Sequence, residues 1–104
     1  MCFISGQLSI NLAGEYVAGS IEEEARRAFS NVFSVAEAAG YFKEEIVYID
    51  IAFADLAEVE TVNVLYQELF AEHKRPARTV YQAAKLPFSA KIKIVATAVK
   101  SNHN

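Results

Sequence analysis

The sequence predicts an α+β domain in which two helices pack on one face of a mixed sheet. Segments with the periodicity of strands and of helices follow one another in the order β-α-β-α-β-β. Each helical segment carries a single apolar stripe, so each helix can bury only one side. The run 46–54 is apolar on nearly both faces, which is typical of a strand in a sheet that helices cover. The 104 residues leave room for one core, so we expect a single domain over 1–100 and a frayed tail over 101–104.

A first strand is expected over residues 2–10, where polar and apolar side chains alternate. Gly6 interrupts the alternation, which predicts a bulge or a close approach of the backbone at that position. The segment 11–19 contains two glycines and is expected to be a connector.

The first helix is expected over 20–40. Ser20 and Glu23 have the spacing of a capping box, and the glutamates 22–24 place favourable negative charge in the first turn. Gly40 is placed to end the helix in a left-handed cap. Because helix capping accounts for these glutamates, none of them is a candidate acid or metal ligand.

The second half of the chain predicts one helix and three strands. After the strand 46–54, a helix is expected to begin at Asp55 and to end in the segment 72–76. Two further strands are expected over 78–85 and 90–100, separated by Leu86-Pro87.

One face of the predicted sheet has no helix to cover it. Asp50 lies within an apolar strand, so it must be paired or must face this uncovered side. An exposed sheet face rich in Val, Ile and aromatic residues would be a large apolar patch. The mean hydropathy of +0.15 is high for a small domain. Both observations predict that the uncovered face is buried between subunits.

Charge and cysteine content exclude several classes of protein. A net charge of −3 argues against a nucleic-acid partner, since such domains usually carry a basic stripe. The single cysteine, Cys2, cannot form an internal disulfide. No apolar run approaches the length of a membrane span, and the start lacks the pattern of a signal peptide. We therefore expect a cytoplasmic protein without a membrane partner.

The candidate functional groups in this sequence are cationic side chains. The two histidines, His73 and His103, show no metal-ligand spacing, and His73 is expected to be a helix C-terminal cation. No nucleophile–base arrangement or phosphate-binding glycine loop is present. The C-terminal third is basic, which fits either a solvated strand face or a local site for a small anion; its cations are Lys74, Arg75, Arg78, Lys85, Lys91, Lys93 and Lys100.

Arg78 is the strongest single candidate among these cations. It opens a strand directly after Pro76-Ala77, where a rigid turn fixes its direction. Its guanidinium has the fork geometry that matches a carboxylate. From the residues alone, Arg78 is either a ligand anchor or a surface ion-pair partner.

Four motifs in order resemble the Rid family of reactive intermediate deaminases, also known as the YjgF-like or L-PSP endoribonuclease family. The strand motif Ser-Gly-Gln is matched by Ser5-Gly6-Gln7, and the end of the first helix by Glu37-Ala38-Ala39-Gly40. The second-helix motif Val-Asn-x-x-Tyr is matched over 62–66. The motif Pro-Ala-Arg followed by Ala-x-Leu-Pro is matched by Pro76-Ala77-Arg78 and Ala84-Lys85-Leu86-Pro87.

The resemblance implies a chorismate-mutase-like fold and a homotrimer, with sheets inside and helices outside. It also implies clefts between subunits that bind a small carboxylic acid. Arg78 would anchor the carboxylate, and Ser5, Gly6 and Gln7 would line the pocket. The implied reaction is hydrolysis of a reactive enamine or imine to a 2-keto acid and ammonia. It needs no metal and no cofactor, only an oriented carboxylate and a positioned water.

The sequence departs from the family pattern at two places. The chain begins at the Ser-Gly-Gln strand, so we expect no counterpart of the family's preceding strand and of its Gly-Pro-Tyr segment, whose tyrosine closes the pocket. Where deaminating members carry a glutamate in the last strand, this sequence has Lys93. An ammonium cannot take a proton from water as a carboxylate can. Lys93 and Arg78 would make the cleft doubly cationic and favour a dianionic or phosphorylated ligand.

Four hypotheses follow. The first is a trimeric deaminase with Arg78 as the catalytic anchor. The second is a non-catalytic module on the same scaffold that binds 2-keto acids or dicarboxylates through Arg78 and Lys93. The third is a ribonuclease or translation inhibitor, for which only His73 offers an imidazole base and the acidic charge is unfavourable. The fourth is a trimer that retains the fold without the activity.

Overall fold

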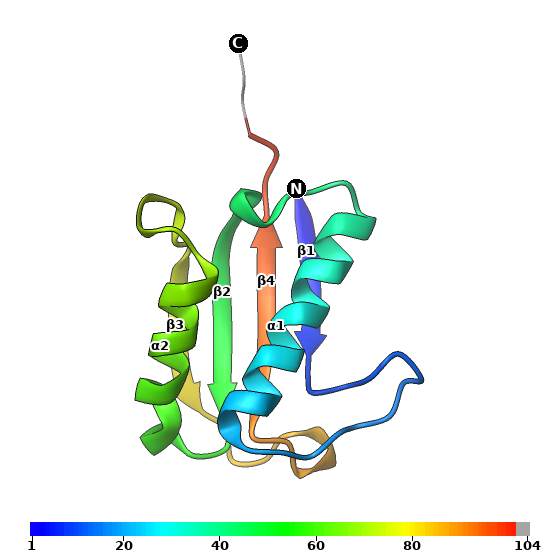
Figure 1. The fold of residues 1–104 in the computed structure, drawn as a ribbon, viewed down its shortest axis with the longest axis vertical. Helices are drawn as coiled ribbons and strands as arrows, with labels where there is room; N and C mark the ends of the chain where they lie inside the picture. The colour runs from blue at the N-terminus through cyan, green and yellow to red at the C-terminus, as the bar shows by residue number, and fades with distance from the viewer. Residues whose placement is uncertain (102–104) are drawn as a thin grey trace.

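The computed structural model describes residues 1–101, and Figure 1 shows two helices on one face of a four-stranded sheet. The strand order is β1-β4-β2-β3; β4 is antiparallel to both β1 and β2, and β3 is parallel to β2. The sheet is therefore mixed, and the predicted α+β class and element order are confirmed. The elements are β1 (Cys2–Gln7), α1 (Ile21–Ala38), β2 (Ile46–Phe53), α2 (Val59–Leu69), β3 (Ala77–Gln82) and β4 (Ile92–Ala98).

β1 ends three residues earlier than the sequence predicts, because the following backbone bonds to a side chain of α1 and to residues 15–17 instead of to β4. Asn31 on α1 donates its side-chain amide to the carbonyls of Leu8 and Ile10, at 2.9 Å each. The irregularity predicted at Gly6 is confirmed, since the β1–β4 register shifts between Ile4 and Gln7.

The capping box of α1 is confirmed. The Glu23 N–H donates to Ser20 Oγ at 3.1 Å, and the Ser20 N–H donates to Glu23 Oε1 at 2.8 Å. Gly40 has the left-handed φ of +85° that the cap requires, although the helix itself ends at Ala38. The expectation that helix capping alone accounts for the glutamates is wrong for Glu24, whose side chain is fully buried and bonds to other segments.

The remaining elements are shorter than predicted. Asp55 accepts the Ala57 N–H at 3.0 Å and caps a short turn over Leu56–Glu58, so α2 begins only at Val59. The two last strands also end inside the predicted ranges 78–85 and 90–100. Of the predicted tail, only Ser101 is described, and His103 lies outside the described residues.

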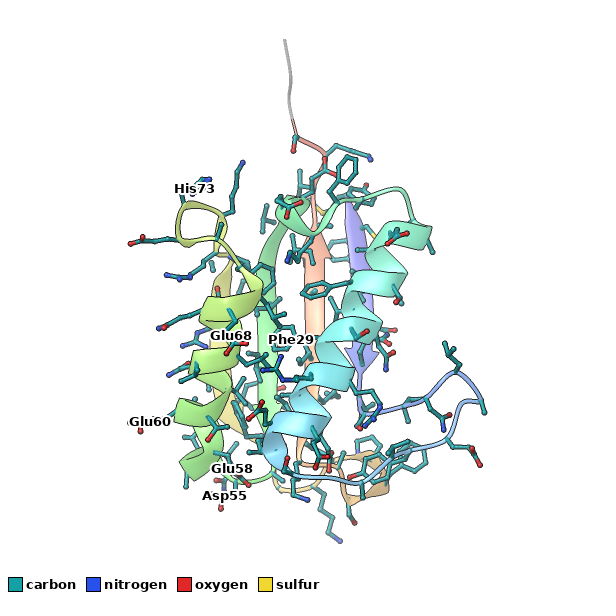
Figure 2. All side chains as sticks on the ribbon, viewed as in Figure 1. Phe29, Asp55, Glu58, Glu60, Glu68 and His73 are labelled. Atoms are coloured by element: carbon teal, nitrogen blue, oxygen red, sulfur yellow. The ribbon has the colours of Figure 1, made fainter. Side chains whose placement is uncertain are left out.

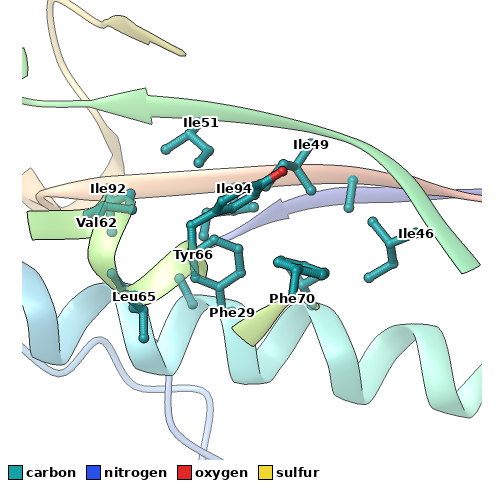
Figure 3. Packing of buried hydrophobic residues seen from close by; sticks show 14 of the residues in the cluster. Phe29, Ile46, Ile49, Ile51, Val62, Leu65, Tyr66, Phe70, Ile92 and Ile94 are labelled. Atoms are coloured by element: carbon teal, nitrogen blue, oxygen red, sulfur yellow. The ribbon is translucent and has the colours of Figure 1, made fainter. Parts of the chain in front are cut away.

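The core lies between the helices and one sheet face. Figure 3 shows aromatic side chains of both helices packed against isoleucines of the central strands. Phe29 on α1 and the buried Phe70 that follows α2 meet edge to face, with ring centroids 6.2 Å apart. Along β4, every second side chain from Ile92 to Ala98 is buried in this core.

The opposite sheet face carries no helix in the described chain, and it is covered only at one end, where Leu86 and Ala90 pack on Ala52. It carries the alternate side chains of β4, among them Lys93, and Phe3, which is 77% exposed. Asp50 also lies on this face, as the sequence allowed, and its Oδ1 is buried without a hydrogen-bond partner. Within residues 1–101, no helix combines the length and the apolar content needed to cross a membrane.

Candidate functional site

Arg78 lies on β3, the edge strand next to α2. It pairs in register with Ile49, a core residue, so its side chain points to the helix side of the sheet. The guanidinium Cζ lies 4.7 Å from the centroid of the Tyr66 ring, which is a cation–π contact. Its Nη1 is buried and makes no hydrogen bond with any described residue. Arg78 therefore presents an oriented, unused donor that suits an anion.

Tyr66 holds this guanidinium in place through the contact with its ring. Its ring is buried, and its hydroxyl donates to the carbonyl of Pro76, the residue just before β3. Burial raises the pKa of Tyr66, although the positive charges of Arg78 and Arg75 oppose the rise. The hydroxyl therefore stays protonated at neutral pH and ties α2 to the start of β3.

Asn63 is a polar residue at this site that the sequence reasoning did not nominate. It precedes Tyr66 by three residues on α2, so the two side chains share one helix face. Its Oδ1 is buried and has no hydrogen-bond partner. The position was visible in the motif Val-Asn-x-x-Tyr, but only the structure shows that the amide is unpaired. An unused acceptor thus lies three residues before the tyrosine whose ring contacts the arginine with the unused donor.

A second group of predicted residues gathers where β1 meets β4. A Cβ added to Gly6 would lie 2.8 Å from Lys93 Cδ, so the Lys93 side chain rests directly on the glycine. The Gln7 side chain donates to the Ser5 carbonyl at 3.0 Å, and Ser5 itself is exposed. None of the ion pairs within residues 1–101 includes Lys93. The structure thus places the Lys93 side chain against Gly6, and Ser5 and Gln7 flank that glycine on β1.

One chain does not bring Arg78 and Lys93 together. Arg78 aligns with Ile49 and, through β2, with Ala96, which all face the helices. Lys93 pairs with Ala52 and points to the uncovered face. The two cations therefore lie on opposite faces, with β2 between their strands. A cleft that contains both must be built from two chains.

The described part of the chain contains no group of side chains that could bind a metal ion. No group of three or more His, Cys, Asp or Glu side chains lies close enough there to hold a metal ion. His73 is exposed in a separate turn after α2, as Figure 2 shows, so it is not in the last turn of that helix as predicted. Of the acidic side chains labelled in Figure 2, Glu60 and Glu68 lie along α2, and Asp55 and Glu58 precede it, so they do not form one cluster.

The fold and these residues define a class of protein: a small α+β domain with one open sheet face and, at the sheet edge, an arginine oriented for an anion. The family described as Endoribonuclease L-PSP matches residues 1–100. The chain belongs to this family, the Rid or YjgF-like family that its motifs resemble, and its fold is the chorismate-mutase-like α+β fold.

Relatives with known names and structures agree with this assignment. The protein named 2-iminobutanoate/2-iminopropanoate deaminase from Bos taurus is 37% identical over 99 residues, which cover 94% of this chain and 72% of that protein. The YjgF gene product of E. coli is similar with a TM-score of 0.85 and 37% identity, covering 95% of this chain and 80% of that one. E. coli TdcF with bound serine has a TM-score of 0.85 and 34% identity, with the same coverage of 95% and 80%.

Proposed function

We propose that this chain hydrolyses reactive imines or enamines of amino acids to 2-keto acids and ammonia. Relatives from Bos taurus and E. coli, at 37% and 36% identity, are named 2-iminobutanoate/2-iminopropanoate deaminases. The observation that carries the proposal is Arg78, whose buried and unpaired Nη1 is held in place over the Tyr66 ring.

In the proposed reaction, the Arg78 guanidinium binds the substrate carboxylate. Its Nη1 donor needs an anionic acceptor, and the contact with Tyr66 limits the directions in which the fork can point. Asn63 can bond the same ligand from α2. Water adds to the carbon of the C=N bond and forms a carbinolamine. A proton then moves from the added oxygen to the nitrogen, the C–N bond breaks, ammonia leaves, and the C=O bond of the 2-keto acid forms.

We further propose that the site lies in clefts between the subunits of a homotrimer. Two features of the single chain support this. The sheet face without helices has exposed apolar side chains such as Phe3 and Tyr48. Arg78 and the group around Lys93 lie on opposite faces, so only neighbouring copies can combine them. One chain would supply Arg78 and Asn63, and its neighbour would supply Ser5, Gly6, Gln7 and Lys93.

A second candidate function is binding of small anions without turnover. The unpaired ammonium of Lys93 favours it, because a second cation beside Arg78 would suit a dicarboxylate. Titration of the wild type with a dicarboxylate and with 2-oxobutanoate, together with an ammonia assay on an imine substrate, separates the two functions. Tight binding of the dicarboxylate without ammonia release supports the binding module, and ammonia release supports the deaminase.

The test of the deaminase is acceleration of ammonia release, above the spontaneous rate, from imines that an amino acid oxidase forms in the same solution with catalase present. The Arg78→Ala variant is compared with Arg75→Ala, which removes an exposed arginine three residues away. Loss of a charge-assisted bond to the carboxylate should lower kcat/KM at least about thirtyfold in Arg78→Ala. Arg75→Ala should retain the wild-type rate. Equal rates in wild type and Arg78→Ala would refute the anchoring role.

A further inference from the structure

Glu24 is a fully buried carboxylate that the proposed reaction does not use. It lies in the first turn of α1, and its side chain is 0% exposed. A buried carboxylate is costly unless donors satisfy both oxygens. Oε2 accepts the Tyr16 hydroxyl at 2.7 Å and the Gly19 N–H at 3.4 Å, and Oε1 accepts the Lys91 N–H at 3.1 Å. Lys91 Nζ adds an ion pair at 3.5 Å.

These partners belong to two segments that are far apart in sequence. Tyr16 lies in the loop between β1 and α1, and Lys91 lies directly before β4. Figure 1 shows both segments at the same end of the sheet, beside the first turn of α1. The Glu24 carboxylate therefore ties the loop after β1 to the start of β4. We call these contacts of Glu24 with Tyr16, Gly19 and Lys91 the Glu24 clasp.

The clasp encloses a turn with an unfavourable backbone. Phe88 and Ser89 have φ angles of +60° and +57°, a region that favours glycine. Successive residues of this kind persist only where their surroundings hold them. The Tyr16 ring stacks on the Phe88 ring, with centroids 5.8 Å apart and planes at 8°. Glu24 thus holds the turn from both sides, through the Tyr16 hydroxyl and through the Lys91 N–H.

Tyr16 can serve only as a donor in this arrangement. Burial, together with the hydrogen bond to the Glu24 carboxylate and its charge, raises the pKa of Tyr16 to about 12. The hydroxyl is therefore protonated at every pH at which the protein would be assayed, and it remains a donor to Glu24.

The clasp lies next to the group around Lys93. Lys91 is two residues before Lys93, and its carbonyl accepts the Ala54 N–H at 2.9 Å, which fixes the start of β4. Leu8 and Tyr16 pack against a small apolar cluster that contains Ala52, the ladder partner of Lys93. A change in the clasp would therefore move β4 relative to β1 at the point where Lys93 rests on Gly6.

We propose that Glu24 is a positioning residue that holds the turn at Phe88–Ser89 and the start of β4 against the loop after β1, and so sets the place of Lys93 beside Gly6. Glu24 itself touches no ligand, because its side chain is buried and its oxygens already accept bonds. The functional part of this proposal rests on the proposed function, since it assumes that Lys93 lines the ligand site.

The test compares Glu24→Gln with Glu23→Gln, which makes the same chemical change at the neighbouring exposed position. An amide at position 24 turns an NH2 group towards donors, so amide hydrogen exchange at Lys91 and Gly19 should become at least about tenfold faster. In the deaminase assay, KM should rise about fivefold or more while kcat changes less than twofold. Glu23→Gln keeps an oxygen that can accept the Ser20 N–H and loses only the exposed charge, so it should leave both exchange rates and KM within about twofold of wild type.

Three results would overturn the proposal. The first is unchanged exchange at Lys91 in a folded Glu24→Gln protein. The second is faster exchange with an unchanged KM, and the third is an equal rise of KM in Glu23→Gln. If Glu24→Gln does not fold, Tyr16→Phe removes one donor and keeps the ring, and the same changes are expected with smaller size. Failure of the proposed function has a different signature: the wild type does not accelerate ammonia release above the spontaneous rate, while the exchange experiment still reports on the clasp.

Discussion

Gly6 on β1 lies directly beneath the side chain of Lys93 on β4, so that an added Cβ would be 2.8 Å from Lys93 Cδ and 3.1 Å from Cγ. The contact joins two residues that are far apart in sequence and that the family pattern places in one pocket. It also explains why a glycine interrupts the alternation of the first strand. At this position the need is for space rather than for an unusual φ, since Gly6 is not among the residues of positive φ.

Gly6→Ala is expected to displace Lys93. Because the clash is with a flexible side chain, the free energy of unfolding should fall by about 1 kcal/mol. The affinity for a dicarboxylate should fall as the ammonium moves away. Urea unfolding and calorimetric titration measure the two effects.

The double variant Gly6→Ala/Lys93→Ala is the control for this prediction. Removal of the Lys93 chain removes the clash, so the stability cost of Gly6→Ala should nearly vanish in the Lys93→Ala background. If the two substitutions add without coupling, the contact between Gly6 and Lys93 does not exist in solution.

Asn63→Leu is expected to separate stability from function. The buried Oδ1 of Asn63 has no partner in the described chain, so an apolar side chain should raise the free energy of unfolding by about 1 kcal/mol. The same change removes the polar group that we propose bonds the ligand from α2, so it should raise KM for the imine. Thermal unfolding and the ammonia assay, made on one preparation, check both signs. A stability loss would show that the amide already has a partner in solution.

Stability should fall on acidification because of Glu45. Hydrogen bonds from the N–H groups of Ser101 and Phe42, together with the charge of Lys100, hold the pKa of Glu45 below its ordinary value of 4.5. A group whose pKa is lower in the folded state stabilises the fold above its unfolded pKa and loses that effect as the pH falls through the folded pKa. Urea midpoints measured between pH 6 and pH 3 should therefore drop below about pH 4.5. Glu45→Gln should drop less steeply, and an equal slope in both proteins would contradict this role.

The sequence predicted the element order, the capping box of α1 and the irregularity at Gly6, because each depends on local patterns of burial, capping or backbone geometry. Element ends were predicted less well. Leu8 to Ile10 alternate like a strand, but the side chain of Asn31 takes up the two carbonyls. That competition involves residues more than twenty positions apart, so no local pattern reveals it.

The candidate site could likewise be predicted only in part. Arg78 could be nominated from the turn before it, and Lys93 from the family pattern. Their placement on opposite faces depends on the register of three strands, which the sequence does not state. The prediction that helix capping accounts for Glu24 is wrong. Its position is that of a first-turn glutamate, but its partners Tyr16 and Lys91 come from distant loops.

The most direct test of a site shared between neighbouring chains is complementation between two inactive variants. Arg78→Ala removes the anchor on one side of the proposed cleft, and Gly6→Leu blocks the other side. If each site takes one side from each of two neighbouring chains, subunits unfolded and refolded as an equal mixture should regain about one quarter of the wild-type activity, because random assembly leaves that share of clefts with both sides intact. A mixture no more active than the separate variants would show that the site is not shared between chains, and would contradict the proposed cleft between subunits.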